Sequence, residues 1–265
     1  EILACRTVIT AEKCASLIPQ IQIEITSKLK AEYANDINMT AQSELFEDVT
    51  YHGVNTLVGS LLGKANECLV YMVATPWSKI TVVGDCSPYI RKLHSMLTTV
   101  IPRLRKVLSW KCFEALCYRF SSDLLDYFLA LIMGLKKISV VGAEQLLLDT
   151  NELKPLLMKL HHTALPQKSL ERSSMQITEK YTEIVGKKSR LIEVVLKLIC
   201  SDDDQIEDTF YIMWPEGQEG DLRTIKALKA STHSTSTTNN AAGNANGKEG
   251  SSHRDHHDGD GISSH

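Results

Sequence analysis

The chain has 265 residues, with 29 lysines and arginines against 32 aspartates and glutamates, so its formal net charge is −3. That length is sufficient for one large domain or two modest ones with a buried core. A charge near balance gives no electrostatic indication of nucleic-acid binding, which favours a basic surface. Proline and glycine number 7 and 14, a low share that indicates a soluble and largely helical protein.

The seven cysteines are odd in number and scattered, without a Cys-x-x-Cys pair. Disulfide frameworks are usually dense and even in number, so we expect reduced thiols that pack as small apolar side chains in a cytosolic protein. The longest apolar run, 127–135, is far shorter than the ~18 residues of a membrane span. The chain begins inside an apolar-periodic segment without an initiator methionine, a pattern expected of a fragment of a longer protein.

Apolar residues recur at helical spacing through most of the chain, and nothing reads convincingly as a strand. The pattern predicts a first helix from Ile2 that Pro19 ends or kinks, and a weaker segment at 21–34. A long helix follows at 40–74, with Thr40 as its N-cap. At 1.5 Å per residue it would span roughly 50 Å, which is typical of stacked helical bundles. Its predicted apolar stripe is Leu45, Val49, Val54, Val58, Leu61, Ala65, Leu69 and Met72.

The next helix is predicted to have Ser87 as its N-cap and Pro88 at its first position, where a missing backbone donor costs nothing. A kink is expected at Pro102. The clearest pattern follows at 113–132 and predicts a helix central to a bundle. Its apolar stripe is Phe113, Leu116, Cys117, Phe120, Leu124, Tyr127, Phe128 and Leu131.

A break at 134–139 is interpreted as a domain boundary, which predicts one helical bundle at 1–137 and a second at 138–230. From 231 to 265 the chain contains almost no apolar residues. Burial there cannot offset the entropy of ordering, so we expect a disordered polar tail.

Within the second bundle, the pattern predicts helices at 140–148 and 152–161. Asp149 and Glu152 have the spacing of a capping box between them. A further helix is predicted at 175–200, with its charged residues facing water.

Several residues could belong to a metal-binding, thiol or phosphate-binding site, but packing or solvent exposure explains them better. Histidines and aspartates at 253–258 could bind a metal weakly, but a polar tail provides no second shell. Cys112 and Cys117 could join His94 in a metal or thiol site, yet Cys117 lies on the apolar stripe. The segment 186–188 lacks the residues that complete a phosphate-binding loop. We therefore expect no catalytic, cofactor-binding or metal-binding residue, and a protein that is not an enzyme.

Three stretches together resemble one known family. They are 84–89 (GDCSPY), 137–150 (KISVVGAEQLLLDT) and 181–187 (YTEIVGK). In order and spacing they are similar to the C-terminal half of the vacuolar protein sorting fifty-three subunit of the Golgi-associated retrograde protein (GARP) complex. The likeness extends from about 2 to 200, and its central stretch is highly specific.

The resemblance implies an all-α fold of tandem helical bundles forming an elongated rod, as in other multisubunit tethering complexes. It implies a non-enzymatic, cofactor-free subunit that holds endosome-derived vesicles at the trans-Golgi network before SNARE-mediated fusion. Such a subunit acts in retrograde transport as a peripheral membrane component on the cytosolic face of the trans-Golgi network and endosomes. Its partners are the other GARP subunits, mainly through an N-terminal part absent here, together with vesicle or SNARE proteins.

The chain departs from the family pattern at Pro155, in an enlarged loop at 165–174, and in its polar tail. These departures concern local helix geometry and the role of the tail. Two other functions stay open, namely a generic helical scaffold and a module that binds anionic membrane surfaces. The lipid-binding function would need a clustered basic face, which 187–190 only begins to supply.

Polar residues inside the similar stretches need an explanation beyond packing. We expect a partner-binding patch on the second bundle, consisting of Gln145, Asp149, Tyr181, Lys187 and Lys188. Gln145 and Asp149 are four residues apart and share one edge of a helix. The simpler alternative is that Asp149 only caps the next helix and the lysines only form a solvated face.

Overall fold

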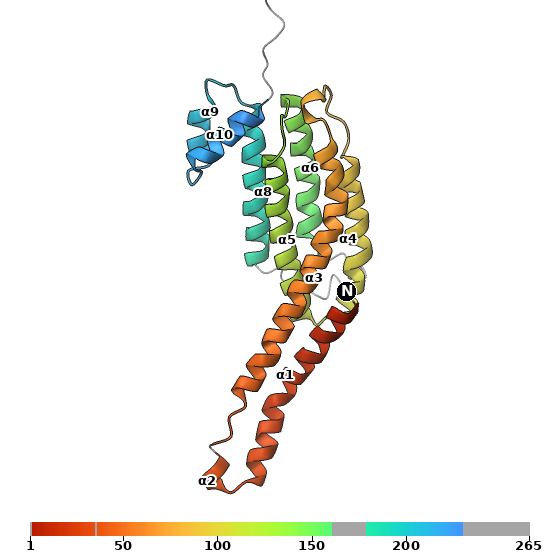
Figure 1. Ribbon diagram of the computed structural model, residues 1–265, viewed down its shortest axis with the longest axis vertical. Coiled ribbons are helices and arrows are strands. Elements are labelled where there is room, and N and C mark those ends of the chain that lie inside the picture. The colour runs from red at the N-terminus through yellow and green to blue at the C-terminus, as the bar shows by residue number, and fades with distance from the viewer. Residues whose placement is uncertain (1, 35, 161–178, 230–265) are drawn as a thin grey trace, which may run out of the picture. The chain divides into compact units, whose positions relative to one another are not determined.

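The computed structural model describes residues 2–34, 36–160 and 179–229 (Figure 1). Within these ranges the chain forms nine α-helices and one short 3-10 helix, and it contains no strand beyond an isolated bridge between Ile138 and Lys229. The predicted all-α fold class is therefore confirmed, whereas the rod shape stays a prediction. The expected loop at 165–174 and the tail lie outside the described residues.

The helices of the described ranges have the following bounds. They are α1 (Ile2–Lys28), α2 (Ala31–Ala34), α3 (Thr40–Ala74), η1 (Trp77–Lys79), α4 (Pro88–Val107), α5 (Trp110–Met133), α6 (Val140–Met158), α8 (Glu179–Cys200), α9 (Ile206–Met213) and α10 (Glu219–Leu228).

Near the start of the chain, the structure excludes an end of the helix at Pro19 and contradicts the predicted Thr40 cap. Helix α1 continues through Pro19 to Lys28, so this proline does not end the helix. Helix α3 begins at Thr40, but its N-cap is Met39, and the predicted Thr40 cap is wrong. The side chain that satisfies this end belongs to Asn38, whose Oδ1 accepts a hydrogen bond from the Thr40 N–H at 2.9 Å.

The starts of α4 and α5 agree with their sequence signals. Ser87 is the N-cap of α4 with Pro88 at its first position, as predicted, and the helix continues past Pro102. At the start of α5, the Ser109 Oγ accepts a hydrogen bond from the Cys112 N–H at 3.3 Å. A proline at the first position and a serine cap fix where these helices begin.

Helix α6 is one continuous helix, and the predicted break between 148 and 152 is wrong. Asp149 and Glu152 have capping-box spacing but lie in the middle of the helix. A carboxylate inside a helix has no free backbone N–H to cap there, so the Asp149 side chain bonds to another segment. Pro155 also lies inside α6, near its C-terminal end.

Helix α5 occupies the centre of the packing, as its pattern predicted. It contacts α3, α4, α8 and α10, and the side chains of Phe113, Phe120 and Phe128 are fully buried. Residues 1–230 form one compact unit, in which buried side chains from α1 to α10 make one cluster. The division into bundles at 1–137 and 138–230 stays a prediction.

The N-terminal part of α3 pairs with α1 and is only partly covered (Figure 1). Leu45 and Val49, which the sequence placed on the buried stripe, are 62% and 37% exposed. By length and composition alone, α3 is the one helix in the described ranges that could cross a membrane. One face of this helix from Val54 to Met72 packs in the core, whereas Val70 and Tyr71 are 54% and 55% exposed.

Candidate functional site

Two side chains of α6 hold the segment that leads into α4. The Gln145 Oε1 accepts a hydrogen bond from the Gly84 N–H at 2.7 Å, and its Nε2 donates to the Asp85 carbonyl at 3.0 Å. The Asp149 carboxylate accepts from the Ser87 N–H at 2.9 Å and from the Tyr89 hydroxyl at 2.6 Å. The similar stretches 84–89 and 137–150 therefore bind each other directly.

Asp149 caps α4 from a helix 60 residues away in sequence. The Ser87 side chain makes no capping hydrogen bond of its own, so the carboxylate provides the acceptor at this end. A negative charge at a helix N-terminus is also favoured by the helix dipole. Burial raises the pKa of Tyr89 well above its ordinary value, and the adjacent Asp149 raises it further. Tyr89 therefore stays protonated and donates to Asp149.

The start of α6 lies against η1 through Ser139 and Gly142. The Ser139 Oγ caps α6 by accepting from the Gly142 N–H at 3.0 Å, and it lies 3.0 Å from the Trp77 carbonyl oxygen. A Cβ atom at Gly142 would lie 2.3 Å from the same oxygen. Any side chain at this position would separate α6 from η1, which explains the glycine in the stretch 137–150.

Tyr181 of the third similar stretch and Lys188, the residue after that stretch, hold α8 against its neighbours. The Tyr181 hydroxyl donates to the Leu157 carbonyl of α6 and lies 3.0 Å from the Ser121 Oγ of α5. Lys188 forms an ion pair with Asp126 of α5. These contacts tie α8 to both α5 and α6.

The five predicted partner-binding residues do not form one exposed surface. Gln145, Asp149 and Tyr181 are 5%, 0% and 4% exposed, and each has hydrogen-bond partners within the chain. Only Lys187 and Lys188 are accessible, and each has an ion-pair partner. Internal hydrogen bonds explain the polar residues of α6, and Asp149 caps α4 rather than a helix that follows it. A partner-binding role stays a prediction, for which only the two lysines are accessible.

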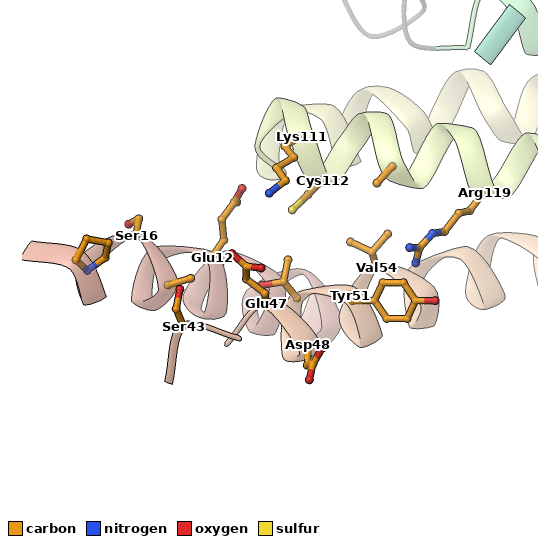
Figure 2. A pocket seen from close by; sticks show the side chains of 14 residues that line it. Glu12, Ser16, Ser43, Glu47, Asp48, Tyr51, Val54, Lys111, Cys112 and Arg119 are labelled. Atoms are coloured by element: carbon orange, nitrogen blue, oxygen red, sulfur yellow. The ribbon is translucent and has the colours of Figure 1, made fainter. Parts of the chain in front are cut away.

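A groove of about 640 Å³ lies between α1, α3 and α5, and no sequence pattern predicted it. Figure 2 shows the charged side chains of Glu47, Asp48 and Lys111 around it. Arg119 stacks on Tyr51, with 4.0 Å from the guanidinium carbon to the ring centroid. Residues of three separate helices form the groove, so no local pattern could reveal it.

The groove has no arrangement typical of a catalytic site. Cys112 lines it, but burial raises the pKa of this thiol and makes it a poor nucleophile. Burial raises the pKa of Cys117 as well. In the ranges 2–34, 36–160 and 179–229, no group of three His, Cys, Asp or Glu side chains could hold a metal ion. The tail segment 253–258, where the sequence predicts no metal site, lies outside those ranges.

The buried tyrosines predict that the protein loses stability at alkaline pH. Burial raises the pKa of both Tyr89 and Tyr181, so their stabilising contribution is complete below the unfolded-state pKa of about 10. Above that pH the unfolded chain loses these protons while the folded chain keeps them. The free energy of unfolding should therefore fall by up to about 1.4 kcal/mol per pH unit for each tyrosine.

Urea unfolding on both sides of pH ~10 measures this loss. Tyr181→Phe should make the alkaline loss shallower, because phenylalanine has no proton to lose. The control is Tyr211→Phe, which changes an exposed tyrosine and should leave the pH dependence as in the wild type. An equal effect of both substitutions would contradict the assignment to buried tyrosines.

Comparisons with known proteins agree with the resemblance inferred from the three stretches. The family described as vacuolar protein sorting-associated protein 53 C-terminus matches residues 144–212. The chain is 29% identical to vacuolar protein sorting-associated protein 53 A of Arabidopsis thaliana over 225 residues, which cover 85% of this chain and 26% of that protein. It is 28% identical to the Caenorhabditis elegans homolog over 162 residues, which cover 60% of this chain and 20% of that protein. The resemblance to the C-terminal region of this family is therefore confirmed, and the chain spans about a quarter or less of these relatives.

Proposed function

We propose that this chain, which resembles the C-terminal region of vacuolar protein sorting-associated protein 53, acts as part of a vesicle-tethering subunit. The observation that carries the proposal is the match at 144–212, which includes most of α6 and the whole of α8. The finer proposal is that the subunit belongs to the GARP complex. It would act in retrograde transport from endosomes to the trans-Golgi network, as a peripheral component on the cytosolic face of these membranes.

The described structure is suited to binding rather than to catalysis. Its buried polar groups Gln145, Asp149 and Tyr181 have partners within the chain, where they fix the positions of α4, α6 and α8. A fixed arrangement of helices can present partner-binding surfaces at constant positions. In this proposal the other subunits bind mainly to the part of the longer relatives that this chain does not include. Vesicle or SNARE proteins bind to surfaces of the helices described here.

The test is made with the full-length protein in its own cells. Removing the region that corresponds to residues 1–230 should trap a recycling receptor in endosome-derived vesicles, as seen by fluorescence microscopy. The other tether subunits should still co-precipitate with the shortened protein. Normal receptor recycling without this region would contradict the proposed function.

The lysine pair on α8 gives a narrower test. Lys187→Glu with Lys188→Glu should impair receptor recycling. Lys187 lies at the surface, where an ion pair contributes about 1 kcal/mol or less, whereas the Lys188 side chain is 22% exposed and pairs with Asp126, so its charge reversal is expected to lower the melting temperature. The matched control is Arg190→Glu with Lys197→Glu, which reverses two other exposed charges on the same helix. If the variant with Lys187→Glu and Lys188→Glu recycles the receptor normally at unchanged expression, these two lysines do not belong to the partner-binding surface.

A further inference from the structure

The outer face of α4 carries positive charge without any negative charge. Residues 88–107 contain five lysines and arginines and no aspartate or glutamate, although the whole chain has a net charge of −3. No acidic residue occurs between Asp85 and Glu114. The opposite face of α4 is apolar and buried, and consists of Tyr89, Ile90, Leu93, Leu97, Ile101 and Leu104.

Four of the five cations lie on one side of the helix and are exposed. Arg91, Lys92, Arg103 and Lys106 fall within one arc at 100° per residue, and all four are accessible; these residues are called the cationic face below. The Lys92 Nζ lies 3.9 Å from the centroid of the Tyr71 ring. Arg103 and Lys106 form no ion pair with any residue that the structure describes. Their charge is therefore available to a ligand.

Helix stability does not explain this arrangement. Cations in the last turn of a helix, such as Lys106, interact favourably with the helix dipole. Arg91 lies near the positive end of α4, where the same dipole disfavours a cation. The Arg91 guanidinium donates a hydrogen bond to the Cys86 carbonyl, so local bonding accounts for this cation but not for Arg103.

Exposed apolar side chains occur in the sequence just before α4 and at its last residue. Val82, in the segment before α4, is 75% exposed, and Val107 at the end of the helix is 48% exposed. Tyr71 is also exposed beside Lys92. An anionic bilayer accommodates these groups together, because cations bind the headgroups while apolar and aromatic side chains enter the interface. An acidic protein would match the cations but would leave these scattered apolar side chains without a role.

We propose that the cationic face of α4 binds the anionic surface of a lipid bilayer. From the sequence alone, the basic segment at 187–190 was the candidate for lipid binding. There Lys187 pairs with Glu183 and Lys188 with Asp126, so those charges are already partnered. The proposal goes beyond the tethering function, since it concerns direct contact with lipid and does not require the other subunits.

Vesicle sedimentation with the purified 265-residue chain tests this proposal. The chain should sediment with phosphatidylcholine vesicles that contain phosphatidylserine and should stay in the supernatant with pure phosphatidylcholine. Binding should weaken as salt increases, because surface charges are screened over about 10 Å at 0.1 M ionic strength. Arg103→Gln with Lys106→Gln should weaken binding by on the order of 25-fold, since each cation near an anionic surface contributes about fivefold.

The matched control is Arg190→Gln with Lys197→Gln, which removes the same net charge from exposed positions on α8. This control should bind phosphatidylserine vesicles like the wild type. Melting temperatures of both double variants should equal that of the wild type, because none of the four side chains is buried. Failure of the wild type to bind phosphatidylserine vesicles would overturn the proposal, and so would equal losses in the two double variants. The two functions can be told apart. If a variant impairs receptor recycling but still binds phosphatidylserine vesicles, its defect lies in the tethering function and not in lipid binding.

Discussion

Phe120→Ala is expected to lower the free energy of unfolding by about 3–5 kcal/mol, as large aromatic truncations in cores do. Phe120 is fully buried in α5, the helix that contacts α3, α4, α8 and α10. Removing its ring deletes contacts with several helices at once and leaves a cavity. Helices tied together by Tyr181 and Asp149 have little freedom to close that cavity.

Urea unfolding monitored by circular dichroism measures this loss. The control is Tyr118→Ala on the same helix, where the ring is 37% exposed and its truncation leaves no closed cavity. The control should lose much less stability than Phe120→Ala. A change below about 1 kcal/mol for Phe120→Ala would show that this side chain lies outside the core.

Helix positions could be predicted where the signal is local. Ser87 and Pro88 fix the start of α4 through their backbone properties, and the structure places the helix start there. The 3–4 spacing of Phe113, Phe120 and Phe128 likewise predicts the buried face of α5, which burial confirms. These features depend on neighbouring residues only, so one sequence is enough to find them.

Other features depend on residues that are distant in sequence. Leu45 and Val49 continue an apolar stripe, but they are exposed, because that part of α3 pairs with α1 and has no helices packed all around it among the described residues (Figure 1). The spacing of Asp149 and Glu152 is the same in a capping box and in the middle of a helix. Only the position of Ser87 and Tyr89, about 60 residues earlier, distinguishes the two.

The candidate site also depends on contacts between residues that are distant in sequence. The sequence singled out Gln145, Asp149 and Tyr181 because packing does not explain polar residues within specific stretches. The structure explains them through hydrogen bonds to other helices. Burial cannot be read from residue type alone, so sequence reasoning expected these residues at the surface. The cationic face of α4 was missed for another reason, since the overall charge balance of the chain hides a local excess.

Asp149→Ala is expected to lower the free energy of unfolding by about 3 kcal/mol, because it leaves one buried and one half-buried donor without an acceptor. These donors are the Ser87 N–H and the Tyr89 hydroxyl, which lie 2.9 Å and 2.6 Å from the carboxylate oxygens. The control is Glu144→Ala, which removes an exposed carboxylate from the same helix and should change stability by less than about 0.5 kcal/mol.

A double-mutant cycle with Tyr89→Phe separates the hydrogen bond from the packing. Tyr89→Phe alone should cost about 1–3 kcal/mol, since it leaves one Asp149 oxygen without its donor. In the Asp149→Ala background the same change should cost less, because the hydroxyl has already lost its acceptor. The two costs should differ by about 0.5–3 kcal/mol, the range measured for residues in one buried network. Additive costs would show that the two groups do not interact. They would then contradict the conclusion that Asp149 holds the stretch 84–89 in place through its own hydrogen bonds.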